Sequence, residues 1–205
     1  MDDDMVIALF RHALTEENKR RGYLGWSDSP LCPEESSSIQ PLSRSYDLLF
    51  SSDSGRCVQT AELLFPNKER ICLFELREMN FGEWEGKTYT ELRGHTDYEN
   101  WLKDPWKHSP PQGESFSEFQ DRVNTGWGKV MEYVLADKAP RAAVMTHGGV
   151  IRALLRDFAP IQKEFWEWDV PHGIGFELTF KKGILRRGGR CTSLQEVPLM
   201  AKNHG

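Results

Sequence analysis

Basic side chains follow three short apolar runs of the chain, close to the point where each run ends. Arg11 and His12 follow the first run, Arg56 comes shortly after the second, and His147 with Gly148 follows the third. If the runs are neighbouring parallel strands, these side chains meet at one edge of a sheet. Such a cluster is costly unless an anion neutralises it, because like charges repel in a desolvated cleft. Phosphate suits the cluster, since arginine offers paired N–H donors and glycine lets backbone N–H groups approach.

Histidine adds covalent chemistry to this cluster. A neutral imidazole nitrogen can attack phosphorus and form a covalent intermediate, and a carboxylic acid must then protonate the leaving oxygen. The segment 75–86 offers four candidate acids beside a turn, namely Glu75, Glu78, Glu83 and Glu85. Composition alone does not choose among them.

The three apolar runs are typical of strands that helices cover on both faces. They occupy residues 6–10, 46–52 and 142–146, and apolar residues at helical spacing follow each strand–turn unit. A long apolar stripe predicts a helix over 115–136, and a further strand is expected at 175–180. The alternation predicts an α/β fold, a three-layer sandwich with a mainly parallel central sheet flanked by helices.

The segment between Gly86 and Gly113 interrupts this alternation. It is rich in Trp, Tyr and Pro, which indicates a small cap or lid with short helices over about 86–114. No repeat or linker divides the rest, so residues 1–205 are expected to form a single domain that carries this insertion. Residues 125–129 are similar to part of a nucleotide-binding loop but lack its full spacing, and we assign them to the long helix.

The composition narrows the range of partners. The chain has 205 residues, 39% of them hydrophobic, and its 26 Lys and Arg against 31 Asp and Glu give a net charge of -5. An acidic chain without a basic block gives no support for binding nucleic acid or an anionic membrane. No membrane-spanning run or secretion signal is evident, and four irregularly spaced cysteines favour reduced thiols. We therefore expect a cytoplasmic protein with a small ligand and no membrane or nucleic-acid partner.

Four segments in order resemble the histidine phosphatase superfamily, in the branch that contains phosphoglycerate mutases, broad-specificity phosphatases and alpha-ribazole phosphatases. Residues 9–18 are similar to the signature Arg-His-Gly-x-Thr-x-x-Asn, 51–61 to the segment of the second arginine, 76–86 to the acid-bearing segment, and 146–152 to the segment of the second histidine. Gly113 to Ser115 also fits. Several ordered motifs over about 6–155 are far more specific than one short motif.

The resemblance implies a role for each matched residue. His12 becomes the phosphorylated nucleophile and Glu78 the general acid and base. His147 is expected to act as a cation beside the phosphate while His12 is neutral, so their pKa values should be pushed apart. No metal ion or other cofactor is implied, because positioning and cationic stabilisation carry phosphoryl transfer in this family. The residues implied to hold the phosphoryl group are Arg11, Asn18, Arg56, His147 and Gly148.

Two positions raise questions within this resemblance. Ala13 replaces the glycine that usually follows the nucleophile, and if the backbone there needs positive φ, alanine costs roughly 1 kcal/mol and weakens activity. His172 is either a substrate contact or a turn residue. The remaining histidines, His95, His108 and His204, are interpreted as structural or solvated.

The leading hypothesis is a metal-independent phosphomonoesterase that hydrolyses small phosphorylated metabolites through a phosphohistidine. In enzyme terms this is a histidine acid phosphatase-type phosphoric monoester hydrolase. One alternative is mutase-type phosphoryl transfer, although the segment from Gly86 to Ser115 is shorter than the cap of such mutases. Another is a non-catalytic module that binds a phosphometabolite. The physiological substrate stays open, although the aromatic lid favours a substrate with an apolar group. The oligomeric state also stays open, and a homodimer is one of the alternatives.

Overall fold

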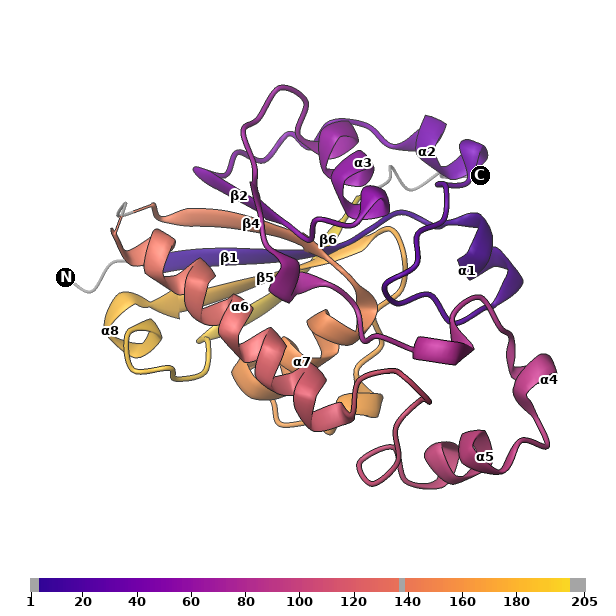
Figure 1. Ribbon diagram of the computed structural model, residues 1–205. Coiled ribbons are helices and arrows are strands. Elements are labelled where there is room, and N and C mark those ends of the chain that lie inside the picture. The colour runs from indigo at the N-terminus through magenta and orange to yellow at the C-terminus, as the bar shows by residue number, and fades with distance from the viewer. Residues whose placement is uncertain (1–3, 137–138, 200–205) are drawn as a thin grey trace.

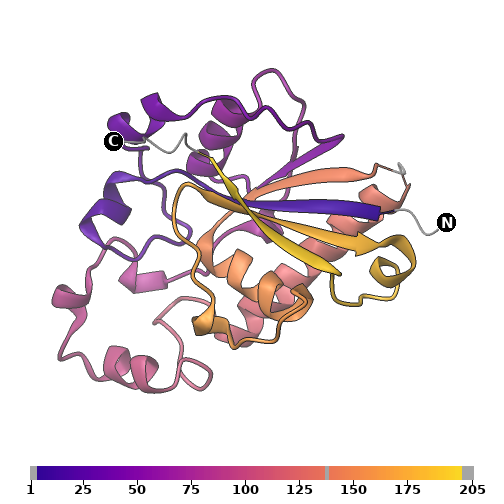
Figure 2. The same ribbon diagram turned by 180° about the vertical axis from the view of Figure 1, so that it is seen from behind.

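The computed structural model describes residues 4–136 and 139–199. Its centre is one six-stranded sheet in the order β3-β2-β4-β1-β5-β6. The pairs β3–β2, β2–β4 and β4–β1 are parallel, whereas β1–β5 and β5–β6 are antiparallel. The mainly parallel sheet is thus confirmed, and the strand expected at 175–180 forms its antiparallel side (Figure 2). The strands are β1 (Asp4–Arg11), β2 (Leu48–Ser51), β3 (Ile71–Cys72), β4 (Arg141–Thr146), β5 (Ile174–Lys181) and β6 (Ser193–Pro198).

Helices cover both faces of the sheet and give the three layers that were predicted (Figure 1). Helix α3 lies on one face, and α6 and α7 lie on the other. The helices are α1 (Glu16–Arg20), α2 (Pro33–Ser38), α3 (Gly55–Leu64), α4 (Tyr89–Leu92), α5 (Thr96–Lys103), α6 (Phe116–Ala136), α7 (Gly148–Phe158) and α8 (Lys182–Leu185), with short 3-10 turns η1 (Phe74–Leu76), η2 (Gly82–Trp84) and η3 (Phe165–Glu167). Residues 125–129 lie inside α6, as expected.

The core lies on both sides of β1, which explains its unbroken apolar sequence. Ile7 and Leu9 belong to the larger core cluster, with residues of α6 and α7. Ala8 and Phe10 belong to a second cluster, with residues of α3. Successive side chains of a strand point to opposite faces, so a strand between two helical layers must be apolar at every position.

The segment that holds α4 and α5 lies beyond the end of the sheet where β1 and β4 finish (Figure 1). It packs on a small aromatic cluster of its own, separate from the two core clusters. Within the described residues, none of the helices is long and apolar enough to cross a membrane. The cluster contains Trp84, Leu92, Tyr98 and Trp101, with Tyr23 and Phe81 against it.

Candidate active site

The carboxyl ends of β1, β2 and β4 bring the predicted residues together. Arg11 is in register with Thr146, and Ser51 with Met145. The chain continues this pairing just past the strands, where the backbone N–H of His12 donates to the carbonyl of Thr146 at 3.0 Å. The rings of His12 and His147 consequently lie 5.1 Å apart between their centroids.

His12 is buried and held as one neutral tautomer. Its Nδ1 lies 2.8 Å from the carbonyl oxygen of Ala13. A carbonyl can only accept, so Nδ1 carries the proton and Nε2 keeps its lone pair. Burial, followed by the charges of Arg56 and Arg11, holds the pKa of His12 well below its usual value. The ring is therefore in the form that a nucleophile needs.

Ala13 does not have the backbone conformation that would make alanine costly. Within the described residues, the non-glycine positions with positive φ are Arg21, Asn67 and Gln112. The condition for the predicted strain is therefore not met. The N–H of Ala13 donates to Oγ1 of Thr60 on α3 at 3.0 Å, which ties the loop after β1 to that helix.

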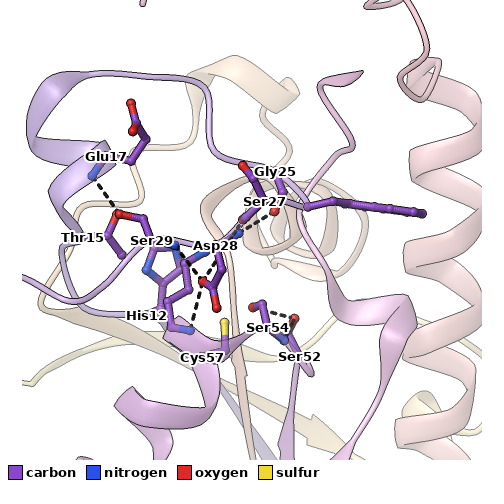
Figure 3. Close-up of polar contacts among 12 residues, drawn as sticks. His12, Thr15, Glu17, Gly25, Ser27, Asp28, Ser29, Ser52, Ser54 and Cys57 are labelled. Atoms are coloured by element: carbon purple, nitrogen blue, oxygen red, sulfur yellow. Dashed lines mark hydrogen bonds and ion pairs between the residues drawn. The ribbon is translucent and has the colours of Figure 1, made fainter. Parts of the chain in front are cut away.

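Arg56 comes from the first turn of α3 and is 1% exposed. Its Nη1 donates to the carbonyl of Ser27 at 2.8 Å and its Nη2 to the carbonyl of Gly25 at 2.6 Å. Asp28, its ion-pair partner at 3.3 Å, is about half exposed. Figure 3 shows Gly25, Ser27 and Asp28 on the loop that faces the end of β2. These contacts fix the guanidinium but leave its Nε buried without a hydrogen-bond partner among the described residues.

Arg11 leaves the same kind of donor free. Its Nη1 donates to the carbonyl of Val170 at 2.6 Å, while its Nε is buried without a partner in the described part of the chain. Burial lowers the pKa of Arg11 to about 10, although the nearby carboxylate of Glu78 acts in the opposite direction. Buried N–H groups without partners are rare and costly in native proteins. Two of them on neighbouring guanidinium groups are well suited to a phosphate group.

His147 is held between Arg56 and two serine hydroxyl groups. Nη2 of Arg56 lies 3.2 Å from its Nδ1, and because arginine can only donate, Nδ1 accepts. Nε2 then carries the proton and faces the hydroxyl groups of Ser52 at 3.0 Å and Ser54 at 3.2 Å. Burial and the charges around it hold the pKa of His147 well below its usual value, as they do for His12. The expected separation of the two pKa values is not seen, because both rings share the same burial and the same two arginines. That His147 becomes a cation beside a phosphate stays a prediction.

Glu78 is separated from the other three glutamates by its position. Its Oε2 accepts the N–H of Gly149 at 2.8 Å, and it lies with Arg11 in the wall of a large cavity. Glu75 pairs with Lys129 at 2.6 Å. The other two do not line that cavity: Glu83 is exposed, and Glu85 accepts several loop N–H groups. The structure thus favours the acid that the resemblance indicated.

Two further predicted residues and one open case lie around this centre. Asn18 lines the cavity, and its Oδ1 accepts from Thr15 at 2.9 Å. Gly148 begins α7, where a side chain would meet the Arg11 guanidinium at 3.3 Å. His172 donates from Nδ1 to the carbonyl of His12 at 3.0 Å, and burial beside Arg11 lowers its pKa to about 4. It therefore holds the backbone of His12 as a neutral side chain.

The cavity beside Glu78 has a volume of about 760 Å³, and eight of the residues in its wall are aromatic. Arg11, Glu78 and Gly149 line it on the side of the cluster, whereas His12 and His147 are 3% and 1% exposed and do not line it. Within residues 4–136 and 139–199, no group of three or more His, Cys, Asp or Glu side chains is placed to hold a metal ion. The aromatic lining consists of Tyr23, Phe81, Trp101, Trp106, Phe116, Phe119, Phe165 and Trp166.

Ser52 and Ser54 were not predicted, although both lie in the segment that resembles the family's second-arginine motif. Their hydroxyl groups lie 3.1 Å apart (Figure 3). Both hydroxyl groups also face Nε2 of His147. Small polar residues directly after a buried strand were the available signal. The sequence does not indicate which histidine they would contact.

Comparisons with known proteins agree with this geometry. Residues 7–183 match the histidine phosphatase superfamily (branch 1). A protein of Hydrogenobacter thermophilus named "Putative phosphoserine phosphatase 2" is 33% identical over 156 residues, which cover 72% of this chain and 75% of that protein. The adenosylcobalamin/alpha-ribazole phosphatase of Escherichia coli is 28% identical over 180 residues, 82% of this chain and 87% of that protein. The crystal structure of the alpha-ribazole phosphatase from Shigella flexneri superposes with a TM-score of 0.79 at 24% identity over 98% of each chain, and proteins named phosphoglycerate mutase also match.

Proposed function

Because the chain belongs to branch 1 of the histidine phosphatase superfamily, we propose that it is a metal-independent phosphomonoesterase that acts through a phosphohistidine on His12. One observation carries the proposal: Arg11 and Arg56 each have a buried Nε–H without a partner among the described residues, and the charges of both act on His12, whose Nε2 keeps its lone pair. From the sequence we expect an enzyme of the histidine acid phosphatase type. Because the chain matches branch 1, we propose a phosphatase of the branch 1 type instead.

In the proposed first step, Nε2 of His12 attacks phosphorus in line with the leaving oxygen. The N–P bond forms as the P–O bond to the leaving group breaks, and the electron pair of that bond goes to the leaving oxygen. Arg11 and Arg56 hold the equatorial oxygens, where negative charge is concentrated. Asn18 and Gly148 add donors, and the N-terminal N–H groups of α7 favour an anion at the same place.

Glu78 supplies and removes the proton in this mechanism. As an acid it protonates the leaving oxygen, and the resulting carboxylate then takes a proton from the water that attacks phosphohistidine. The N–P bond breaks as the new P–O bond forms, its electron pair returns to Nε2 of His12, and inorganic phosphate is released. The position of Glu78 supports this role, because its side chain lines the cavity and its Oε2 accepts the N–H of Gly149 at 2.8 Å, at the start of α7. His147 is neutral beside Arg56, and we propose that it gains a proton as a phosphate dianion arrives, because an adjacent negative charge raises a histidine pKa.

We further propose a leaving group with an apolar or aromatic part, and a cap made by residues 86–114 inserted into a single domain. A cavity of about 760 Å³ is within the usual range for a small-molecule site. Trp101 and Trp106 from that segment line it together with Phe116 and Phe165, and the ring of Trp106 packs directly on that of Phe116. Aromatic rings stabilise a flat apolar group by burial and by edge or offset contacts.

The two alternatives are less well supported. A mutase must retain a polar product and return the phosphoryl group to it, whereas the eight aromatic residues of the wall favour an apolar group. A module that only binds phosphate has no use for a proton donor, yet Glu78 faces the cavity beside Arg11. Water is therefore the proposed acceptor.

The test is phosphate release by the purified full-length chain from p-nitrophenyl phosphate in the presence of a chelator. We expect turnover and, after an alkaline quench, a phosphoryl group on His12. His12→Ala should abolish both, while His108→Ala, which removes an exposed histidine, should change neither. Turnover that persists in His12→Ala, or that disappears with the chelator, would contradict the proposal. A panel of phosphoserine, alpha-ribazole phosphate, sugar phosphates and aryl phosphates then ranks the substrate classes.

A further inference from the structure

Arg122 on α6 has every guanidinium donor occupied. Nε and Nη2 donate to the two carboxylate oxygens of Glu114, each at 2.7 Å. Nη1 donates to the carbonyls of Glu75 at 3.0 Å and Arg77 at 2.8 Å, and Nη2 also donates to the carbonyl of Glu78 at 2.9 Å. A guanidinium has five N–H donors, and each of these has its own acceptor. Three of the five acceptors are main-chain carbonyls of the segment that carries the proposed acid.

The same segment is held from its other side. The carbonyl of Leu76, which lies between those bound by Arg122, accepts from Oγ1 of Thr146 at 2.7 Å. Thr146 ends β4 directly before His147. The carbonyl of Glu78 accepts a second bond, from Nε1 of Trp26 at 3.1 Å. The backbone that carries the Glu78 carboxylate is thus fixed between α6 and the strand that supplies the second histidine.

Close packing of α6 allows Arg122 to reach this segment. Gly126 lies one turn after Arg122 and is buried, and a Cβ at that position would come within 2.9 Å of the Glu75 Cβ. Aromatic rings also surround the guanidinium, with centroids 5.8 Å away for Trp26 and 5.5 Å for Phe119. Rings at these distances favour the cation and exclude water from its hydrogen bonds.

We propose that Arg122 is a positioning residue for general acid catalysis by Glu78; this rests on the proposed function. Arg122 does not itself line the cavity, and it acts through the main chain of Glu78, by fixing the direction in which the Glu78 side chain leaves the backbone. Proton transfer in a transition state requires a donor within hydrogen-bond reach of the leaving oxygen. Lysine has three donors and no planar fork, so it can replace at most three of the five hydrogen bonds.

Two substrates with different leaving groups separate this role from general support of the fold. p-Nitrophenolate leaves readily without a proton, whereas the alkoxide of benzyl phosphate needs one. We expect Arg122→Gln and Arg122→Lys to lower kcat/KM, which reports the step in which the leaving group departs, roughly 10- to 100-fold more for benzyl phosphate than for p-nitrophenyl phosphate, within the range attributed to general acid catalysis. Glu78→Gln removes the proposed acid itself, so it should show the largest difference between the two substrates. KM for both substrates should change little.

Lys129→Gln is the matched control, because Lys129 also joins α6 to this segment, through the Glu75 carboxylate at 2.6 Å, without touching its carbonyls. It should affect both substrates equally. Glu114→Gln, which keeps the shape of the clamp and removes its charge, should discriminate in the same direction as Arg122→Gln but less strongly. Thermal unfolding of each variant identifies any that does not fold, and Arg122→Lys with Glu114→Gln then carries the test.

The possible failures are distinguishable. Equal losses on both substrates in the Arg122 and Glu114 variants, beside strong discrimination in Glu78→Gln, would overturn the positioning role and leave the proposed function standing. Absence of discrimination in Glu78→Gln itself would refute the general acid role on which the inference rests. Activity that survives His12→Ala would refute the phosphohistidine mechanism.

Discussion

Gly149→Ala is predicted to lower catalytic activity while it leaves the free energy of unfolding nearly unchanged. The N–H of Gly149 donates to Oε2 of Glu78 at 2.8 Å, and a Cβ added at Gly149 would lie 2.2 Å from Oε1 and 3.0 Å from Cδ of the same carboxylate. Non-bonded heavy atoms prefer separations of about 3.5 Å. The carboxylate must therefore move by roughly 1 Å, and it can do so because it is the end of a flexible side chain.

The expected magnitudes follow from this displacement. Gly149 lies in the first turn of α7, and alanine in a helix is more stable than glycine by about 0.5–1 kcal/mol. That gain offsets the cost of moving the carboxylate, so the free energy of unfolding should change by less than about 1 kcal/mol. A misplacement of about 1 Å in a catalytic group lowers the rate roughly 100-fold. We expect that loss in kcat/KM for benzyl phosphate and a smaller loss for p-nitrophenyl phosphate.

Gly128→Ala is the control for this variant. Gly128 is an exposed helix residue of α6, and a Cβ there would meet no atom within 4 Å. It should stabilise the protein by up to about 1 kcal/mol and leave both activities unchanged. The measurements are steady-state kinetics on both phosphates and chemical denaturation of all three proteins. Wild-type activity toward benzyl phosphate in Gly149→Ala would show that the contact with Glu78 plays no part in proton transfer.

Three other perturbations have defined outcomes. The pKa of His172 is about 4 in the folded protein against an ordinary value near 6.5, so the unfolded chain binds more protons between these two pH values. The free energy of unfolding should therefore fall as pH drops from about 7 to 4. His172→Asn should make denaturation curves less dependent on pH in that window. Replacing both Ser52 and Ser54 by alanine removes the hydroxyl partners of His147 Nε2, and denaturation should show a loss of about 1–3 kcal/mol, whereas an unchanged stability would mean that the pair contributes nothing. Trp106→Ala removes a ring that packs on the cavity wall, and KM for aryl phosphates should rise about 2- to 10-fold with kcat unchanged; a loss confined to kcat would contradict the proposed leaving-group site.

The sequence predicts the sheet and the cationic cluster because both depend on local pattern. Unbroken apolar runs form strands that are buried on both faces, and the residue that follows such a run must lie at the strand's end. Arg11, His12 and His147 could therefore be placed together from their order in the chain. The antiparallel direction of β5 could not be predicted this way, because a single apolar run does not reveal which way it pairs.

The charge states and supports of the site depend on contacts between distant segments. Burial and the charge of Arg56, which donates to Nδ1 of His147 across 91 positions of sequence, hold the pKa of His147 below its usual value. His172 reaches the carbonyl of His12 across 160 positions. Arg122 was not singled out because a single arginine on an amphipathic helix is typical of a solvated face. Its five acceptors come from two segments that only the folded chain brings to α6.

The bond between Nδ1 of His12 and the carbonyl of Ala13 has a consequence for how this site tolerates mutation. Many catalytic histidines depend on a carboxylate side chain for their tautomer, and such a partner can be lost by one substitution or by acid. Here the acceptor is main chain, which every residue type possesses and which does not titrate. Position 13 can therefore vary in side chain while the nucleophile keeps its proton on the correct nitrogen, so alanine in place of the family's glycine leaves this part of the machinery intact.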